Sequence, residues 1–341
     1  MRVVEDYVHR TGEHCASTAL RNLLAHHGHD LSEGMIFGLA SGLGFFYLRD
    51  PSISPTRMFH GRTPTLEADF GPNTGMDVRE VAEPDDEVAW QRLRASIDAG
   101  HPVMLSTDTF YLGYHRTTSH FPGHRCVAVG YDDESESVLI ADRKFEAYQR
   151  CSAEELRRSR NARDYPMSCE NRYSAFGPRV AFGKPLPEAI LGALARNARS
   201  MLEPDTTAFD VPAAAGIPAM RELAAGFAGW KDAPDWSWAA RFGYQVVVKR
   251  GAAGSFFRSL EADFLRESAA HVPEIGEAGL AARMDEAAAR WCDLAALLKE
   301  QSERESCDPT LFGRAGEVAA ELADREERLF AQALRLCERL L

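Results

Sequence analysis

The chain has 341 residues, of which 45% are hydrophobic and 26% are charged, a composition typical of globular proteins that excludes wholly disordered and collagen-like chains. Its formal net charge of -12 at pH 7 predicts that neither nucleic acid nor an anionic membrane is a partner. No stretch reaches the roughly 18 apolar residues that a membrane-spanning helix needs. The N-terminus has no apolar signal segment, and the seven cysteines are scattered, which together favour a cytoplasmic protein.

The first half of the chain mixes helical and strand signals. A helix is expected from Cys15 to Ala25, because apolar residues recur there at helical spacing. A second helix is expected over residues 86–99, where a glycine and a proline follow. Short apolar runs bounded by turn residues predict buried strands at Pro102–Ser106, Cys126–Gly130 and Val138–Ala141.

The composition changes near residue 180, after which a proline-closed linker leads into mostly helical sequence. We therefore predict two domains, residues 1–180 and 181–341. Two apolar stripes at helical spacing indicate packed core or faces for a partner helix, which leaves a homodimer open. The stripes consist of Leu280, Met284, Trp291, Leu294 and Leu298, and of Val318, Leu322, Leu329, Ala333, Leu336 and Leu340. Gly251 and Gly254 favour a simple turn over a phosphate cradle.

Three residues combine into a candidate chemical site: Cys15, His124 and Asp142. Cys15 stands where a helix is expected to begin, and a helix N-terminus lowers the pKa of a thiol by favouring the thiolate. His124 starts the second predicted strand and Asp142 ends the third. A tight turn makes these two strands antiparallel, which places the carboxylate beside the imidazole. The carboxylate would orient the imidazole, and the imidazole would take the proton of Cys15.

Each of these residues has a simpler interpretation when taken alone. A cysteine at a helix start is commonly a small buried hydrophobe, and a histidine before a strand commonly lies at the surface. His120 is the alternative base, although a proline–glycine turn separates it from His124. A zinc site built from Cys15, His14, His120 and His124 lacks the usual ligand spacing, so we predict no metal.

Two segments of the chain resemble a known family. Residues 10–48 contain the run His-Cys-Ala-Ser-Thr from His14 onward, a Leu-Ser-Glu step and a glycine-rich apolar segment. Residues 119–145 contain Gly123-His124 before Val-Ala-Val-Gly-Tyr-Asp. These features resemble the N-terminal domain of butirosin biosynthesis protein H. The segment Arg250–Glu267 resembles the helical domain that commonly follows it.

The resemblance implies an α+β, papain-like fold, with the N-terminal helix packed on an antiparallel sheet and a mostly helical domain behind it. It also implies an acyltransferase of natural-product biosynthesis that moves an aminoacyl group from an acyl carrier protein to an amine acceptor. Cys15 would be the nucleophile, His124 the base and Asp142 its orienter. No cofactor would be bound permanently, because the phosphopantetheine arm of the carrier protein delivers the donor.

The sequence that would form the oxyanion hole differs from that of the related leader peptidases. Those enzymes have a glutamine a few residues before the cysteine, and residues 11–14 of this chain contain none. The backbone N–H groups of Cys15 and His14, or the side chain of His9, are the candidates that remain.

A basic stretch follows Asp142 and includes Arg143, Lys144, Arg157 and Arg158. Carrier proteins are acidic and their arm carries a phosphate, so this stretch is a candidate docking surface. A solvated helix face paired with neighbouring glutamates explains it equally well.

Two other classes of function stay open. A cysteine peptidase or amidase would use the same triad but would admit water and an extended substrate. A non-catalytic scaffold would retain the fold without the chemistry, and the simultaneous presence of Cys15, His124 and Asp142 argues against it.

Overall fold

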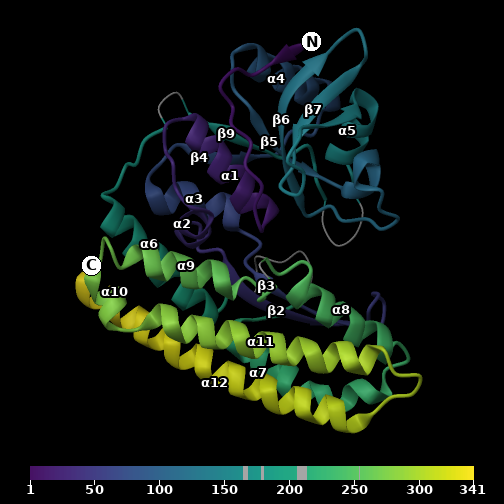
Figure 1. The fold of residues 1–341 in the computed structure, drawn as a ribbon, viewed down its shortest axis with the longest axis vertical. Helices are drawn as coiled ribbons and strands as arrows, with labels where there is room; N and C mark the ends of the chain where they lie inside the picture. Colours follow the sequence, from purple (N-terminus) through teal and green to yellow (C-terminus); the bar gives the residue numbers. More distant parts are fainter. Residues whose placement is uncertain (164–167, 178–179, 206–212, 253) are drawn as a thin grey trace. The chain divides into compact units, whose positions relative to one another are not determined.

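The computed structural model describes residues 1–163, 168–177, 180–205, 213–252 and 254–341. Its fold is α+β, as predicted, with an antiparallel sheet in the N-terminal part and a mostly helical C-terminal part (Figure 1). Two compact units divide the chain. The first contains Met1–Ile36 and Gly75–Ala181, and the second contains Phe37–Thr74 and Phe182–Leu341.

The second unit resumes at Phe182, inside the predicted linker. The segment Phe37–Thr74 belongs to this unit, whereas the sequence analysis groups it with residues 1–180. The chain passes between the units at three places, and the predicted boundary at residue 180 lies beside the last of them. Within the described residues we find no helix whose length and hydropathy would let it cross a membrane.

The sheet of the first unit has the strand order β4-β9-β5-β6-β7-β8, with β1 paired to β6, and every pairing is antiparallel. Its strands are β1 (Arg2–Val3), β4 (Val78–Val81), β5 (Val103–Thr107), β6 (His124–Asp132), β7 (Ser137–Ala141), β8 (Gln149–Ser152) and β9 (Tyr173–Phe176). The three predicted strands are confirmed as β5, β6 and β7. The turn between β6 and β7 forms the predicted hairpin.

Three α-helices of the first unit pack against this sheet: α1 (Cys15–His26), α4 (Asp86–Asp98) and α5 (Ala153–Arg160). The helices predicted from Cys15 and over 86–99 are confirmed as α1 and α4. The apolar stripe of α1 is buried, which explains why this segment folds as a helix on β5 and β6. Two 3₁₀ turns, η1 (Thr109–Tyr111) and η2 (Gly113–His115), lie between β5 and β6. The helix α2 (Glu33–Leu39) spans the first junction between units.

The second unit contains a three-stranded antiparallel sheet of order β10-β2-β3 and the C-terminal helices. The strands are β2 (Leu43–Arg49), β3 (Arg57–Arg62) and β10 (Ala214–Ala215). The helices are α3 (Leu66–Thr74), α6 (Leu186–Leu202), α7 (Gly216–Gly226), η4 (Phe227–Asp232), α8 (Trp236–Val248), α9 (Arg258–Ser268), α10 (Pro273–Glu277), α11 (Leu280–Ser302) and α12 (Pro309–Leu340).

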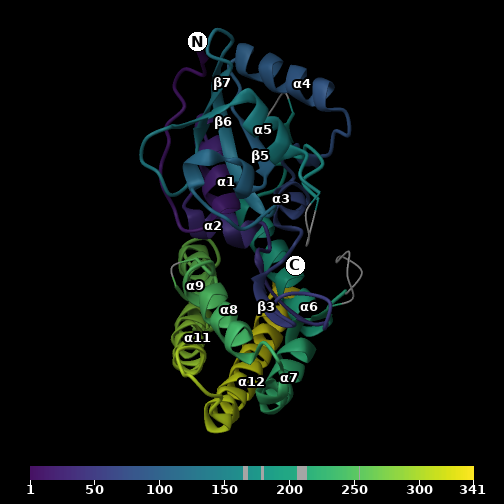
Figure 2. The same cartoon turned by 90° about the vertical axis from the view of Figure 1, so that its right-hand side faces the viewer.

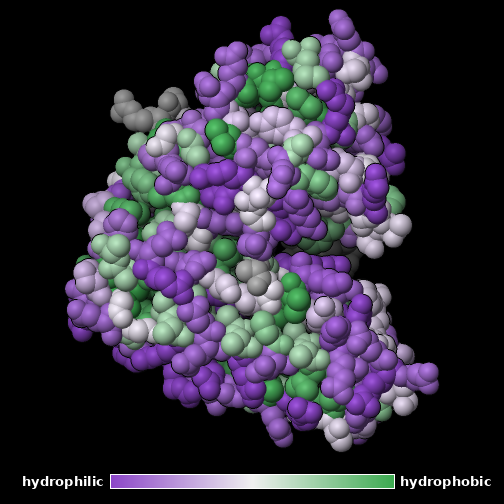
Figure 3. All heavy atoms as spheres, viewed as in Figure 1, coloured by the Kyte–Doolittle hydropathy of each residue, from purple (hydrophilic) through white to green (hydrophobic). Residues whose placement is uncertain are grey.

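The two apolar stripes lie on the long helices α11 and α12, which pack against each other (Figure 1). All their members are buried except Leu340, so the stripes form core within this unit. The helices α6 and α7 lie beside α12 (Figure 2). Hydrophilic side chains are spread over the visible surface of the long helices (Figure 3).

The glycine pair before α9 forms a turn, as the sequence favours. A side chain at Gly251 would collide with the carbonyl oxygens of Val246 and Val247. The glycine is therefore required by close packing against α8, and the carbonyl groups that face it would repel a phosphate.

Candidate active site

Cys15 is the first residue of α1, as the sequence predicts. His14 caps the helix: its backbone is extended, and its side chain accepts a hydrogen bond from the backbone N–H of Ser17 at 3.4 Å. Cys15 is buried, with 7% of its surface exposed. The helix start thus holds the thiol in a fixed position at a site that water reaches poorly.

The β6–β7 hairpin brings His124 and Asp142 together. Nε2 of His124 lies 2.7 Å from Oδ2 of Asp142, and both side chains are buried. Because Nε2 is occupied by the carboxylate, Nδ1 is the nitrogen left for Cys15, whose thiolate helps to raise the pKa of His124. The hairpin therefore places the imidazole in hydrogen-bond contact with the carboxylate, and the charge of the thiolate acts on the same imidazole.

The surroundings of Cys15 favour the thiolate. Burial alone would raise the pKa of the thiol, but the charge of His14 and the hydrogen bonds from His124 and His14 hold that pKa well below its usual value. Burial likewise opposes the imidazolium of His124, yet the charge and hydrogen bond of Asp142, together with Cys15, raise the pKa of His124 to about 9. The arrangement stabilises a thiolate–imidazolium pair.

Two residues that the sequence analysis missed complete the surroundings of Asp142. Nε2 of His115 and the hydroxyl of Tyr114 each lie 3.0 Å from Oδ2, the atom that also bonds His124. Burial would raise the pKa of Asp142, but the charge of His124 and the hydrogen bonds from His115 and His124 hold it well below its usual range. Asp142 is therefore ionised at neutral pH.

Glu33 is a third residue that sequence reasoning did not single out, although it lies in the Leu-Ser-Glu step. Its carboxylate accepts hydrogen bonds from the backbone N–H groups of Glu13, at 3.0 Å, and His14, at 2.8 Å. The hydroxyls of Ser17 and Thr18 donate to it at 2.8 and 2.9 Å. This one side chain fixes the turn that leads into Cys15.

The turn before Cys15 also requires a glycine. A side chain at Gly12 would collide with Thr18 and with the Glu33 carboxylate. The backbone N–H of Gly12 donates to the carbonyl of Arg143 at 3.2 Å, which ties the turn to the segment after β7. The two chain segments that carry Cys15 and Asp142 are thus bonded directly to each other.

Two of the expected oxyanion-hole donors, on His14 and His9, already form hydrogen bonds within the protein. The N–H of His14 already donates to Glu33, so it is not available to a substrate oxygen. The ring of His14 instead hydrogen-bonds Cys15. Nε2 of His9 lies 2.7 Å from the carbonyl oxygen of Phe145, which occupies that ring nitrogen. The backbone N–H of Cys15 remains as a candidate donor.

His120, the alternative base, lies in a different group. Its Nδ1 contacts Oδ2 of Asp108 at 2.7 Å, and its ring stacks on Phe110 with centroids 4.0 Å apart. The imidazole that pairs with Asp142 and bonds Cys15 is therefore His124. A zinc set that includes both His120 and Cys15 is not assembled.

His115, His124 and Asp142 offer ligand atoms that all lie within 4.8 Å of one another, a separation that a metal ion could bridge. The same atoms bond each other at 2.7 and 3.0 Å. Tetrahedral zinc with ligand bonds of about 2.0–2.1 Å would need these atoms to move apart. The hydrogen-bonded arrangement is therefore the one that the side chains adopt.

The four basic candidates for carrier docking differ in their surroundings. Arg143 donates to the carbonyl of Gly12 at 3.3 Å, so it belongs to the frame of the site. Lys144 is exposed beside it. Arg157 lies over the ring of Trp90 and Arg158 over the ring of Tyr111, with 5.0 and 4.8 Å to the centroids.

A buried thiol between two imidazoles, backed by a carboxylate, is the arrangement of proteins that use cysteine as a nucleophile. Residues 14–143 match the family described as butirosin biosynthesis protein H, N-terminal, and residues 154–333 match a domain of unknown function, DUF4872. The chain therefore belongs to the two-domain family in which the first of these domains is followed by the second. No curated protein matches the chain.

Proposed function

We propose that this protein is an amide-forming acyltransferase of antibiotic biosynthesis, with Cys15 as its nucleophile. The observation that carries the proposal is the lowered pKa of a buried thiol in contact with His14 and His124, with His124 held by Asp142 at 2.7 Å. The family name supports the biosynthetic setting, since it refers to the making of butirosin. The donor is an acyl group on the phosphopantetheine thiol of an acyl carrier protein.

In the first half-reaction the Cys15 thiolate attacks the thioester carbonyl. The bond from Sγ to the carbonyl carbon forms, and the bond from that carbon to the pantetheine sulfur breaks. The imidazolium of His124, whose pKa is raised to about 9, gives its proton to the leaving thiolate. Cys15 then carries the acyl group as a thioester, so the energy of the donor bond is retained and no ATP is consumed.

In the second half-reaction an amine attacks the acyl group on Cys15. Neutral His124 accepts a proton from the attacking nitrogen, and the Cys15 thiolate leaves as the amide forms. Asp142 stabilises the imidazolium produced at this step, and His115 and Tyr114 hold the same carboxylate oxygen that bonds His124. Burial of the thiol restricts water, which favours transfer to an amine over hydrolysis.

Arg157 and Arg158 are the docking residues that we propose for the acidic carrier protein. With Tyr111 and Arg163 they line a shallow depression of about 650 Å³ in the first unit. Asp86 and Glu154 line the same depression and Arg157 pairs with Glu87 at 3.4 Å, so Arg158 and Arg163 would contribute most to attracting the phosphate and the acidic surface of the carrier. Arg143 is left out because its hydrogen bond to Gly12 gives it a structural task.

Reversal of charge at Arg158 tests this docking surface. We expect Arg158→Glu to raise KM for a carrier-bound donor about fivefold, which corresponds to about 1 kcal/mol, and to leave KM for a free pantetheine thioester unchanged. Arg314→Glu makes the same change of charge on an exposed position of the second unit and should change neither value. An equal rise for both donors would refute docking at this surface.

Intact-protein mass spectrometry tests the function itself. The protein is mixed with short acyl-pantetheine thioesters and with carrier-loaded acyl groups, and its mass is measured before and after an amine is added. We expect one acyl group on the wild type, none on Cys15→Ala, and faster discharge by amines than by buffer. Cys292→Ala is the matched control. Cys292 is an exposed residue, and partial burial of its thiol raises the pKa, so its thiolate is not favoured.

The outcomes separate the three classes of function. An adduct that buffer discharges as fast as amines do would identify a hydrolase. An adduct that persists in Cys15→Ala would place the nucleophile elsewhere. A protein that no donor acylates, even from a carrier, would be a scaffold without this chemistry.

A further inference from the structure

The first unit contains a cavity of about 310 Å³ that takes no part in the site described above. It is lined by α4, by the start of β5 with the two residues before it, by β9 with the residue after it, and by His27 and Arg160. His27 immediately follows α1, so the cavity lies at the C-terminal end of the helix whose N-terminus carries Cys15. Its volume falls at the lower end of the range of small-molecule sites, about 300–1,000 Å³.

The length of α1 separates the cavity from Cys15. The helix has 12 residues, and at about 1.5 Å per residue its ends are about 18 Å apart. The strand β5 also separates the cavity from the catalytic residues. Val103, at its start, lines the cavity, and Thr107, at its end, pairs with His124. A molecule of this volume in the cavity would therefore not reach the thiol.

Arg160 gives the cavity an unusual charge. The side chain is only 3% exposed, and burial lowers its pKa to about 10, so it is a cation at neutral pH. Among the residues that the structure describes, Nη1 donates to the carbonyl oxygen of Ala89 at 3.3 Å, and Nε is buried without a partner. Among the described residues no carboxylate lies within 4.0 Å of Arg160, although the charge of Asp86 acts on it from a greater distance and favours its cation. A buried cation that no described carboxylate contacts directly is costly, which favours an anion in the cavity that Arg160 lines.

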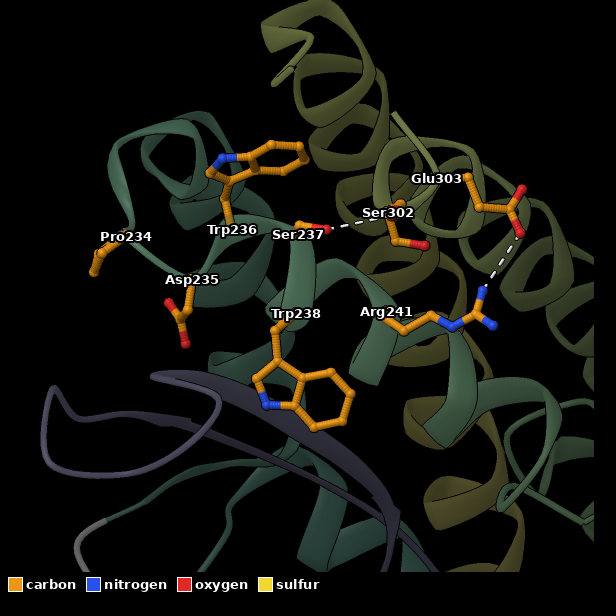
Figure 4. A pocket seen from close by; sticks show the side chains of 8 residues that line it. All are labelled: Pro234, Asp235, Trp236, Ser237, Trp238, Arg241, Ser302 and Glu303. Atoms are coloured by element: carbon orange, nitrogen blue, oxygen red, sulfur yellow. Dashed lines mark hydrogen bonds and ion pairs between the residues drawn. The ribbon is translucent and has the colours of Figure 1, made fainter. Parts of the chain in front are cut away.

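The nearest other cation on the cavity wall is already neutralised. Arg92 pairs with Glu83 at 2.9 Å and donates to the hydroxyl of Tyr173 at 3.4 Å. For comparison, an open depression of about 600 Å³ in the second unit surrounds Trp236 and Trp238 (Figure 4), and its arginine, Arg241, pairs with Glu303 at 3.4 Å. Arg160 differs from both of these arginines in that no carboxylate of the described part of the chain forms an ion pair with it.

Aromatic rings form another part of the cavity wall. The rings of His27 and Phe176 stack with centroids 5.1 Å apart, and His27 also stacks on His101 at 6.0 Å. Burial, and then the neighbouring histidines, lower the pKa of His27 to about 4, so its ring is neutral and does not compete with Arg160 for an anion. A planar aromatic group is the shape that such a wall accommodates.

We propose that this cavity is a second ligand site, which binds a small aromatic carboxylate with its carboxylate on Arg160 and its ring against His27 and Phe176. The planar guanidinium offers donors in the geometry that a carboxylate accepts. The ring would add to a stack that already exists. The site is independent of the acyl-transfer chemistry proposed for Cys15.

Isothermal titration calorimetry with benzoate and its neutral analogue benzamide tests the proposal on the full chain. We expect saturable binding of benzoate and binding of benzamide that is at least about tenfold weaker, because the charge-assisted hydrogen bonds are lost. Arg160→Met removes the charge and keeps the length of the stem, and it should weaken benzoate by a similar factor. Cys15→Ala should bind benzoate as the wild type does.

A second variant keeps the test informative if Arg160→Met fails to fold. Ala95 lines the cavity from an exposed position on α4, so Ala95→Phe would fill the opening while Arg160 stays in place. It should also abolish benzoate binding. Absence of saturable benzoate binding to the folded wild type would overturn the proposal, and so would equal affinities for benzoate and benzamide or undiminished binding to Ala95→Phe.

Discussion

At the scale of single residues, the proposed chemistry depends on two opposite pKa shifts. The thiolate of Cys15 must be present for attack, and its pKa is lowered well below the usual value. The imidazolium of His124 must be present to protonate the leaving thiol, and its pKa is raised to about 9. Between these two values both groups are in the reactive form, so the acylation rate should have a broad plateau.

Replacement of Asp142 tests this plateau. The carboxylate favours the charged imidazole, so Asp142→Asn should lower the pKa of His124 and move the alkaline limb of the rate profile below pH 9. We also expect the rate at the optimum to fall about a hundredfold. Acylation rates measured from pH 5 to pH 10 check both effects.

Tyr114→Phe is the matched control for this variant. It removes one hydrogen bond of 3.0 Å from the same carboxylate oxygen but leaves the negative charge in place. Its alkaline limb should stay near that of the wild type. If the limb of Asp142→Asn also stays near pH 9, the carboxylate does not control the charge of His124.

The sequence could predict that His124 and Asp142 lie together, because a hairpin turn joins two strands that begin and end with them. It could not predict Tyr114 and His115, which follow a different strand and reach Asp142 through a 3₁₀ turn. Their approach depends on how that turn folds back over the hairpin. Local propensity carries no information on such a contact.

At the scale of elements, the N-terminus of α1 depends on Glu33. Its carboxylate takes four hydrogen bonds, from two backbone N–H groups and two hydroxyls. We expect Glu33→Ala to lower the free energy of unfolding by about 3 kcal/mol, because buried donors are left unpaired. The variant should also slow acylation at Cys15, since His14 loses the bond that fixes it. Urea unfolding and the acylation rate measure the two effects.

Two further variants serve as controls for this prediction. Glu33→Gln keeps an acceptor oxygen and should lose less stability than Glu33→Ala. Glu13→Gln changes an exposed carboxylate in the same turn and should stay within about 0.5 kcal/mol of the wild type. A Glu33→Ala protein as stable and as reactive as the wild type would contradict the role of this side chain.

Elements with a strong local pattern were predictable, such as α1 from its apolar spacing and the β6–β7 hairpin from its turn residues. The strand β2 was not predicted, because its apolar run continues from a glycine-rich segment without alternation, and β3 was not predicted, because its sequence RMFHGR has no apolar run. The sequence also gave no reason to connect Glu33 with the turn before Cys15. That connection spans 19 residues to His14 and exists only after α2 has packed.

At the scale of the whole molecule, the segment Phe37–Thr74 belongs to the second unit because of buried polar contacts as well as its apolar core. Arg258, at the start of α9, donates to the carbonyl oxygens of Gly44 and Gly61 on β2 and β3. The same guanidinium pairs with Glu326 of α12 at 2.7 Å, and both side chains are fully buried. One charged pair thus connects the small sheet to the C-terminal helices.

Removal of one member of the Arg258–Glu326 pair should destabilise the second unit strongly. Glu326→Ala leaves a buried guanidinium and the indole N–H of Trp291 without their acceptor, and we expect a loss of about 3–5 kcal/mol. The double variant Arg258→Met with Glu326→Leu removes both charges and should be more stable than Glu326→Ala. Urea unfolding of the three proteins provides the comparison. A double variant no more stable than the single one would show that the uncompensated charge is not the cause.

The most direct test of the central claim compares two cysteines of the same chain. Iodoacetamide is reacted with the protein at a series of pH values, and alkylation of Cys15 and Cys292 is followed by peptide mass spectrometry. A reactive thiolate at Cys15 predicts a rate that stays high well below pH 8, while the rate at exposed Cys292 falls with an ordinary or raised thiol pKa. Parallel pH profiles for the two cysteines would contradict the claim that His14, His124 and Asp142 activate Cys15.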